Sequence, residues 1–263
     1  MGQEPLPIRT VAQLLAVDGP ARDEVRSWVE QCPVPVQVLP RDPRRAEETL
    51  HRLQVTVRST LGSMAYDCGG LLVDHGWLRL LGGGYGDLPT LAEANGMGAP
   101  SHGRGAPASV LLGWDLVGGC FAIDGGAYGA PFGHVCYFAP DLLEWEDLGM
   151  GHSAFVEWVL SGEVRHFSLD LRWPGWEEAA QRTGLGEVVS VTPAPWETTG
   201  RRAQVTRQAV PVGQQLALQA EVLLAEDPTQ KPPALGAWTG PGGVARAAAE
   251  ASPAPLDAHG AER

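Results

Sequence analysis

The chain has 263 residues, 44 % of them hydrophobic, and its 31 Asp and Glu against 19 Lys and Arg give a formal net charge of −12. So acidic a chain lacks the basic footprint that a nucleic-acid backbone requires, so we expect no nucleic-acid partner. Lys231 is the only lysine, which argues against Schiff-base and P-loop chemistry. No apolar run approaches the roughly 20 residues of a membrane span, so we expect no membrane partner.

Cysteine usage and the N-terminus point to one compartment. The four cysteines form no C-x-x-C pair, and each lies beside apolar or glycine residues, where a reduced thiol behaves as a small hydrophobic group. The sequence "MGQEPLPIRT" has no basic region followed by an apolar run, as an export signal would. We therefore expect free thiols and a cytoplasmic protein.

The first fifth of the chain is helical in pattern. Thr10 and Gln13 have the spacing of a capping box, and Asp42 followed by Pro43 is typical of a helix start. The segment "VPVQVL" between these helices reads as a short strand.

The middle of the chain predicts strands in succession. Residues 71–73 and 77–81 read as a hairpin closed by Asp74-His75-Gly76, followed by a long loop, Gly82 to Ser109. Four apolar segments come next, and the last of them, "LLEWED", alternates apolar and acidic residues. Helical patterns return at "HSAFVEWVLSG" and at residues 212–225. The fold class is therefore α+β, an antiparallel meander sheet flanked by short helices.

Composition sets the predicted domain boundary. After Glu226 the sequence turns to Pro, Ala and Gly, with too little apolar content to offset the entropy of ordering. We expect a single α+β domain over residues 1–227 and a disordered tail over residues 228–263.

Two turn motifs carry the residues that could do chemistry. Asp74 and His75 could be a general base with its orienting group, or two metal ligands, but neighbours on a hairpin turn point apart, which favours a structural turn with Gly76. Asp124 before Gly125 and Gly126 could form an oxyanion or metal site, but also suits a turn in which one glycine takes positive φ. The enzyme or metal-binding alternative combines Asp74, His75, Asp124 and His134. We expect no cofactor.

The carboxylates Asp141, Glu144, Glu146 and Asp147 form the other candidate site. Alternation in "LLEWED" turns Trp145 inward as a structural residue and leaves Glu144 and Glu146 outward, while Asp147 shares the parity of Trp145. These carboxylates could form a glycosidase-like pair, but pairs on one exposed strand face are more often solvated charge, and a partner-binding face is the more economical functional interpretation. A partner for this acidic face would be a basic protein.

Long motifs carry a resemblance to known proteins. These motifs are the segments "VTVRSTLGSMAYDCGGLLVDHGWLRLLGGG", "GGCFAIDGGAYG", "GHVCYFAPDLLEWEDL" and "LRWPGW". Through them, the chain resembles the bacterial domain-of-unknown-function family 2625 from about Pro5 to Glu226. The meander ending in "YFAPDLLEWEDL" before an aromatic helix also looks like the Smi/Knr-type (SUKH) superfamily. That likeness implies an immunity protein that binds a toxin domain, or an intracellular adaptor.

Overall fold

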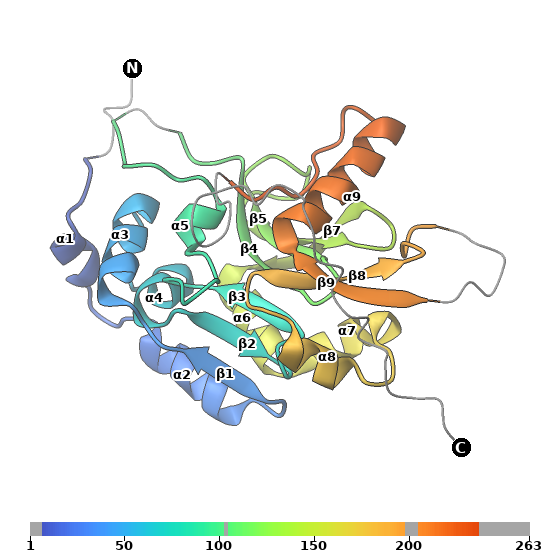
Figure 1. Cartoon of the computed structure of the whole chain (residues 1–263). Helices are drawn as coiled ribbons and strands as arrows, with labels where there is room; N and C mark the ends of the chain where they lie inside the picture. Colours follow the sequence, from blue (N-terminus) through green and yellow to red (C-terminus); the bar gives the residue numbers. More distant parts are fainter. Residues whose placement is uncertain (1–6, 103–104, 198–204, 237–263) are drawn as a thin grey trace.

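A computed structural model describes residues 7–102, 105–197 and 205–236. Seven strands form one antiparallel sheet in chain order: β1 (Val36–Leu39), β2 (Gly70–Val73), β3 (Leu78–Leu81), β4 (Ser109–Asp115), β5 (Cys120–Asp124), β6 (His134–Ala139) and β7 (Glu144–Gly151). The predicted α+β meander is therefore confirmed (Figure 1).

Short helices and a second ribbon surround this sheet. The helices are α1 (Val11–Leu15), α2 (Arg22–Gln31), α3 (Pro43–Leu53), α4 (Thr60–Asp67), α5 (Leu91–Ala94), α6 (His152–Leu160), α7 (Glu163–Phe167), the 3-10 turn η1 (Leu169–Leu171), α8 (Trp176–Arg182) and α9 (Val212–Glu226). Strands β8 (Glu187–Thr192) and β9 (Thr206–Pro211) pair antiparallel with each other, apart from the main sheet. No described helix has the length and apolar character that crossing a membrane demands.

The predicted helix starts are present. Thr10 and Gln13 form both hydrogen bonds of a capping box at α1, and the Asp42 side chain accepts from the Arg45 N–H at the start of α3. These signals were readable because a cap and its partner lie three residues apart.

Strand register divides the sheet into two faces. Leu71, Leu80, Phe121 and Tyr137 lie on the helical face, where the ring of Phe121 is 5.1 Å from Phe155 of α6. The strand register places a second set of residues on the opposite face: Leu72, Arg79, Trp114, Cys120, Phe138 and Trp145. We call this the C-terminal face, because residues from the C-terminal part of the chain lie against it. The segment that follows α8 covers this second face, and α9 lies against the β4–β5 turn (Figure 1).

The glycine run after β3 is a point of close packing. A Cβ on Gly82 would lie 2.7 Å from the Cys68 carbonyl oxygen, and one on Gly83 would lie 2.9 Å from that of Ala65. Glycine is needed here because α4 approaches the backbone too closely for any side chain. The loop from Gly82 to Ser109 also contains α5, and much of its first half is buried.

The packed chain continues nine residues past the predicted boundary at residue 227. Residues 228–236, here called the C-terminal strap, run from α9 toward α5: the Lys231 carbonyl accepts from the Trp145 indole N–H at 2.7 Å, and the Gly236 N–H donates to the Ala94 carbonyl at 2.6 Å. Leu235 packs against the core. The rest of the predicted tail, residues 237–263, lies outside the described residues.

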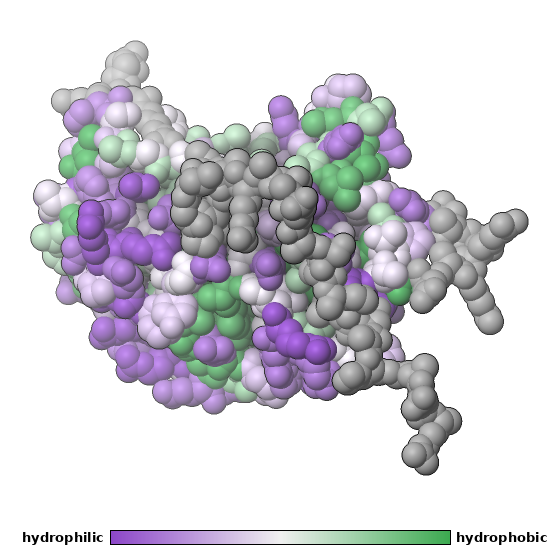
Figure 2. Space-filling view, in the orientation of Figure 1, coloured by the Kyte–Doolittle hydropathy of each residue, from purple (hydrophilic) through white to green (hydrophobic). Residues whose placement is uncertain are grey.

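Surface hydropathy is uneven on the face shown in Figure 2. Apolar surface gathers on α9, where Leu218 and Leu224 are exposed, and over β2 and β3 between hydrophilic areas (Figure 2). The four cysteines are all free, and three of them are buried.

Candidate functional site

Asp74 belongs to a buried ion cluster. Asp74, His75 and Gly76 have φ values of 54°, 58° and 87°, so the hairpin turn predicted for them is confirmed. The Asp74 carboxylate accepts from Arg165 Nε at 3.0 Å and Arg172 Nη1 at 2.6 Å. Burial opposes ionisation, but the hydrogen bonds and charges of these two arginines outweigh it and lower the Asp74 pKa. Asp74 therefore ties the turn to the region of α7 and η1.

Asp124 organises the β5–β6 connection. Its Oδ1 accepts from the backbone N–H groups of Gly126 at 2.7 Å, Ala127 at 2.6 Å and Tyr128 at 3.2 Å. Gly126 has a φ of 104°, whereas Gly125 has no positive φ, so the predicted turn with one left-handed glycine is confirmed. An aspartate that accepts three backbone donors is a structural capping group.

The four residues of the enzyme alternative do not converge. Because the strands are antiparallel in chain order, Asp74 and His75 in the β2–β3 turn lie at one end of the sheet, and Asp124 and the start of β6 lie at the other. His134 contacts Asp147 at 3.0 Å, and His75 contacts Gln181 at 3.3 Å. Within the described ranges, no group of three or more His, Cys, Asp or Glu could hold a metal ion.

The predicted acidic face is an acidic edge. Strand β7 is the last strand of the sheet, and its register places Glu144 and Glu146 on the helical side and Asp147 on the C-terminal side. All three side chains are exposed, while Asp141 is half-buried in the preceding turn. We call Glu144, Glu146 and Asp147 the acidic edge.

Two of the three carboxylates of the acidic edge are without a partner among the described residues. Asp147 accepts from the Gly149 N–H at 2.8 Å and contacts His134, and these interactions lower its pKa, the backbone bond contributing most. Glu144 and Glu146 form no hydrogen bond or ion pair with a described residue. Exposed apolar side chains lie near both ends of the strand, Leu142 at 68 % and Phe132 at 75 % exposure.

Trp145 is half-buried. Its ring stacks on Tyr128, with centroids 3.8 Å apart, and lies 5.3 Å from Phe138. Its indole N–H donates to the strap. The structural role predicted for Trp145 agrees with these contacts, although the ring remains accessible at the edge of the sheet.

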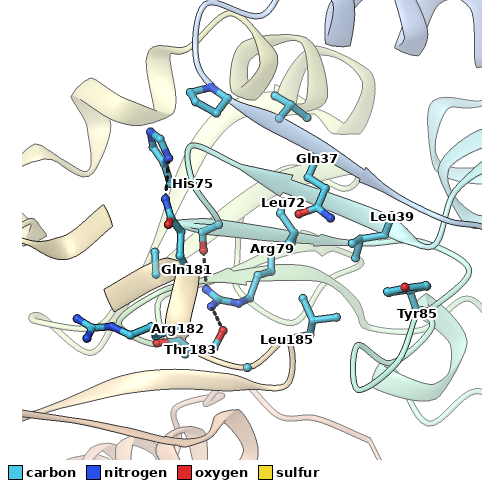
Figure 3. Close-up of a pocket in the computed structure, with 15 residues that line it drawn as sticks. Gln37, Leu39, Leu72, His75, Arg79, Tyr85, Gln181, Arg182, Thr183 and Leu185 are labelled. Atoms are coloured by element: carbon cyan, nitrogen blue, oxygen red, sulfur yellow. Dashed lines mark hydrogen bonds between the residues drawn. The ribbon is translucent and has the colours of Figure 1, made fainter. Parts of the chain in front are cut away.

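A cavity of about 540 Å³ lies on the C-terminal face, between β1–β3 and residues 180–185 (Figure 3). Leu39, Leu72 and Leu185 give it apolar walls, and none of its 15 lining residues is Asp or Glu. Arg79, which is 1 % exposed, lies across it and donates from Nη1 to the Gly76 carbonyl at 2.7 Å and from Nη2 to the Thr183 carbonyl at 3.4 Å. The side chain of Arg182 points away from Arg79 (Figure 3).

Sequence reasoning missed Arg79. Strand alternation in "WLRLL" assigns it to the face opposite Leu78 and Leu80, and a two-stranded hairpin would leave that face in water. The covering residues are about a hundred positions later in the chain. A lone arginine within an apolar strand was the only local signal.

These features define an α+β protein with an up-and-down sheet, an acidic edge strand and a cavity over a buried arginine. The chain belongs to the family of proteins of unknown function DUF2625, whose model matches residues 11–215. It is 34 % identical over 190 residues to the uncharacterized protein YbfG of Escherichia coli strain K12, covering 72 % of this chain and 86 % of that one. An uncharacterized protein of Haemophilus influenzae is 30 % identical over 187 residues, covering 71 % and 82 %. No solved structure matches the chain, so the likeness to SUKH proteins stays a prediction.

Proposed function

We propose that the protein is a protein-binding module that recognises a basic partner through the acidic edge. The observation that carries this proposal is the position of Glu144 and Glu146, two exposed carboxylates on the terminal strand of the sheet that pair with no described residue. The SUKH resemblance would make the partner a toxin domain, with the chain acting as its immunity protein, or would make the chain an intracellular adaptor.

The edge strand supports recognition in two ways. An edge strand presents backbone N–H and C=O groups that a partner strand can pair with, and carboxylates along it discourage pairing with a second acidic copy of the same chain. A basic partner meets no such repulsion. Charge on this strand therefore favours a heterologous complex over self-association.

The apolar residues near the strand ends add contact area. Leu142 and Phe132 are the two most exposed large apolar side chains among the described residues. Charged residues that flank apolar contacts commonly set the association rate and the choice of partner, while the apolar contacts contribute affinity.

Charge reversal tests the proposal. The full chain would be immobilised and exposed to lysate of its own bacterium, as the wild type and as a Glu144→Arg/Glu146→Arg variant. The control is Glu30→Arg/Glu47→Arg, which changes the net charge equally at exposed helical positions. Each captured basic protein would then be purified and titrated at about 0.05 M and about 0.5 M salt, between which the Debye length falls severalfold.

We expect a basic protein that the wild type and the control retain and that the edge variant loses, with an affinity about tenfold or more weaker after reversal and in high salt. Equal binding by the edge variant and the control would contradict the proposal. So would affinities that do not change with salt.

A further inference from the structure

Arg79 is a buried charge that pairs with no carboxylate in the described part of the chain. Buried ions in proteins are normally paired, because the cost of desolvation is otherwise not offset. This chain follows that rule at Asp74, which two arginines neutralise. Arg79 forms no ion pair with a described residue, and its Nε is buried without a hydrogen-bond partner.

The nearby carboxylates are already occupied. Asp115 accepts from the N–H groups of Val117 and Gly119 at 2.9 and 2.8 Å and from the Tyr137 hydroxyl at 2.7 Å. Glu187 accepts from the Gly184 N–H at 2.9 Å. Burial lowers the Arg79 pKa to about 10, against the opposing charges of Asp115 and Glu187, so the guanidinium remains protonated at neutral pH.

Two nitrogens of the guanidinium have hydrogen-bonding capacity that the described residues do not fill. Among the described residues, Nη1 donates a short bond to the Gly76 carbonyl, Nε has no partner, and Nη2 has only the 3.4 Å bond to the Thr183 carbonyl. Arginine recognises planar anions such as carboxylates through two parallel hydrogen bonds, one from Nε and one from an Nη nitrogen.

The cavity around Arg79 fits an anion with an apolar body. Its volume of about 540 Å³ is in the range of small-molecule sites. It contains no acidic residue in a chain of net charge −12, and leucines line its walls. Gln37, His75 and Gln181 supply further polar groups (Figure 3).

We propose that this cavity binds a small organic carboxylate, with the carboxylate on Arg79 and the apolar body against Leu39, Leu72 and Leu185. The acidic edge plays no part in this inference, so either proposal can fail without the other.

Titration of the full chain with simple probes tests the site. Isothermal titration calorimetry would compare benzoate and hexanoate with their neutral amides, benzamide and hexanamide, and with inorganic phosphate. We expect binding of at least one carboxylate, with its amide about tenfold or more weaker because the charge-assisted pair is lost. No carboxylate binding up to about 10 mM would overturn the proposal. An amide that binds as well as its acid, or phosphate binding alone, would overturn it too.

Two variants assign the site. Arg79→Lys keeps the positive charge but removes the planar guanidinium, which donates two parallel hydrogen bonds, and should abolish carboxylate binding. Because a buried substitution can impair folding, the second variant is Gln37→Glu, at an exposed position that lines the cavity. Its added charge should weaken carboxylate binding about tenfold or more by repulsion. The control Gln31→Glu carries the same charge on α2, on the helical side of the sheet, and should bind as the wild type does. An unchanged affinity in Gln37→Glu would overturn the assignment.

Discussion

Asp74 and Asp115 are both buried at the same end of the sheet, and their pKa values shift in opposite directions. Two arginines lower the pKa of Asp74 despite its burial. Burial raises the pKa of Asp115 to about 6, although Tyr137 and two backbone N–H groups favour its ionised form. The difference follows from direct ion pairing, because neutral donors and the charge of Arg79, which forms no ion pair with Asp115, offset desolvation less than two hydrogen-bonded guanidinium groups do.

The raised pKa of Asp115 predicts a pH dependence of stability. Between the ordinary aspartate pKa of about 4 and the folded value, Asp115 binds more protons in the folded state than in the unfolded state, so its contribution to stability falls as pH rises through that window. Asparagine does not titrate, and at position 115 it can still accept the two backbone hydrogen bonds and donate to Tyr137. Asp115→Asn should therefore remove about 2–3 kcal/mol of the stability that the wild type loses through Asp115 as pH rises. Urea midpoints from about pH 4 to about pH 8 measure it.

The control for Asp115→Asn is Asp170→Asn, at an exposed aspartate. That variant should keep the wild-type slope of midpoint against pH. If Asp115→Asn and the wild type lost stability in parallel as pH rises, Asp115 would not titrate in this window.

The roles of single residues could be predicted only where their partners are close in sequence. Asp124 caps N–H groups two to four residues ahead, so a turn role could be read from "IDGG". Asp74 also lies in a predicted turn, but Arg165 and Arg172 are more than ninety positions away. Without the topology, nothing links these three residues.

Elements with local signals were predictable, and elements that depend on packing were not. Hairpins and caps have short-range signatures, and α9 has a long helical pattern. Helix α4 contains glycine and serine and has weak intrinsic helix propensity, and it is buried between its neighbours. Strands β8 and β9 are separated by a long connection, so no hairpin signal joins them.

The glycine pair in the β5–β6 connection predicts two different costs. Gly126 has a positive φ and open space around its Cα, so Gly126→Ala should cost about 1 kcal/mol through backbone strain. A Cβ on Gly125 would collide with the Pro107 carbonyl oxygen, so Gly125→Ala should cost about 2 kcal/mol or more. Denaturant midpoints measure both costs.

Gly98→Ala is the matched control for the glycine pair. That glycine has open space and no positive φ, so its midpoint should stay within about 0.5 kcal/mol of the wild type. Equal costs at Gly125 and Gly126 would contradict the distinction between steric and backbone strain.

At the scale of the whole molecule, the strap connects parts of the fold that are distant in sequence. It joins α9 to Trp145 at the edge of the sheet and to Ala94 of α5, inside the loop from Gly82 to Ser109. Composition alone did not reveal this packing. A segment rich in proline and glycine becomes ordered only through contacts with the folded surface, and those contacts depend on the tertiary structure.

Truncation measures the contribution of the strap. A chain that ends at Asp227 loses the Trp145 hydrogen bond and the burial of Pro233 and Leu235, and should be about 2–4 kcal/mol less stable than a chain that ends at Gly236. The two chains would be compared by urea denaturation. Identical midpoints would show that residues 228–236 do not stabilise the domain.

The order of the strands bears on how the chain folds during synthesis. Each strand of the main sheet after β1 pairs with the strand before it in the chain. The sheet can therefore form strand by strand during translation, and most of the connecting loops that must close are short. Thr183, Gln215, Gln219 and Lys231, which contact the C-terminal face of the sheet or the turns beside it, come only with the last described quarter of the chain. A nascent chain therefore passes through a stage with a formed sheet and an open apolar face, a surface that chaperones bind.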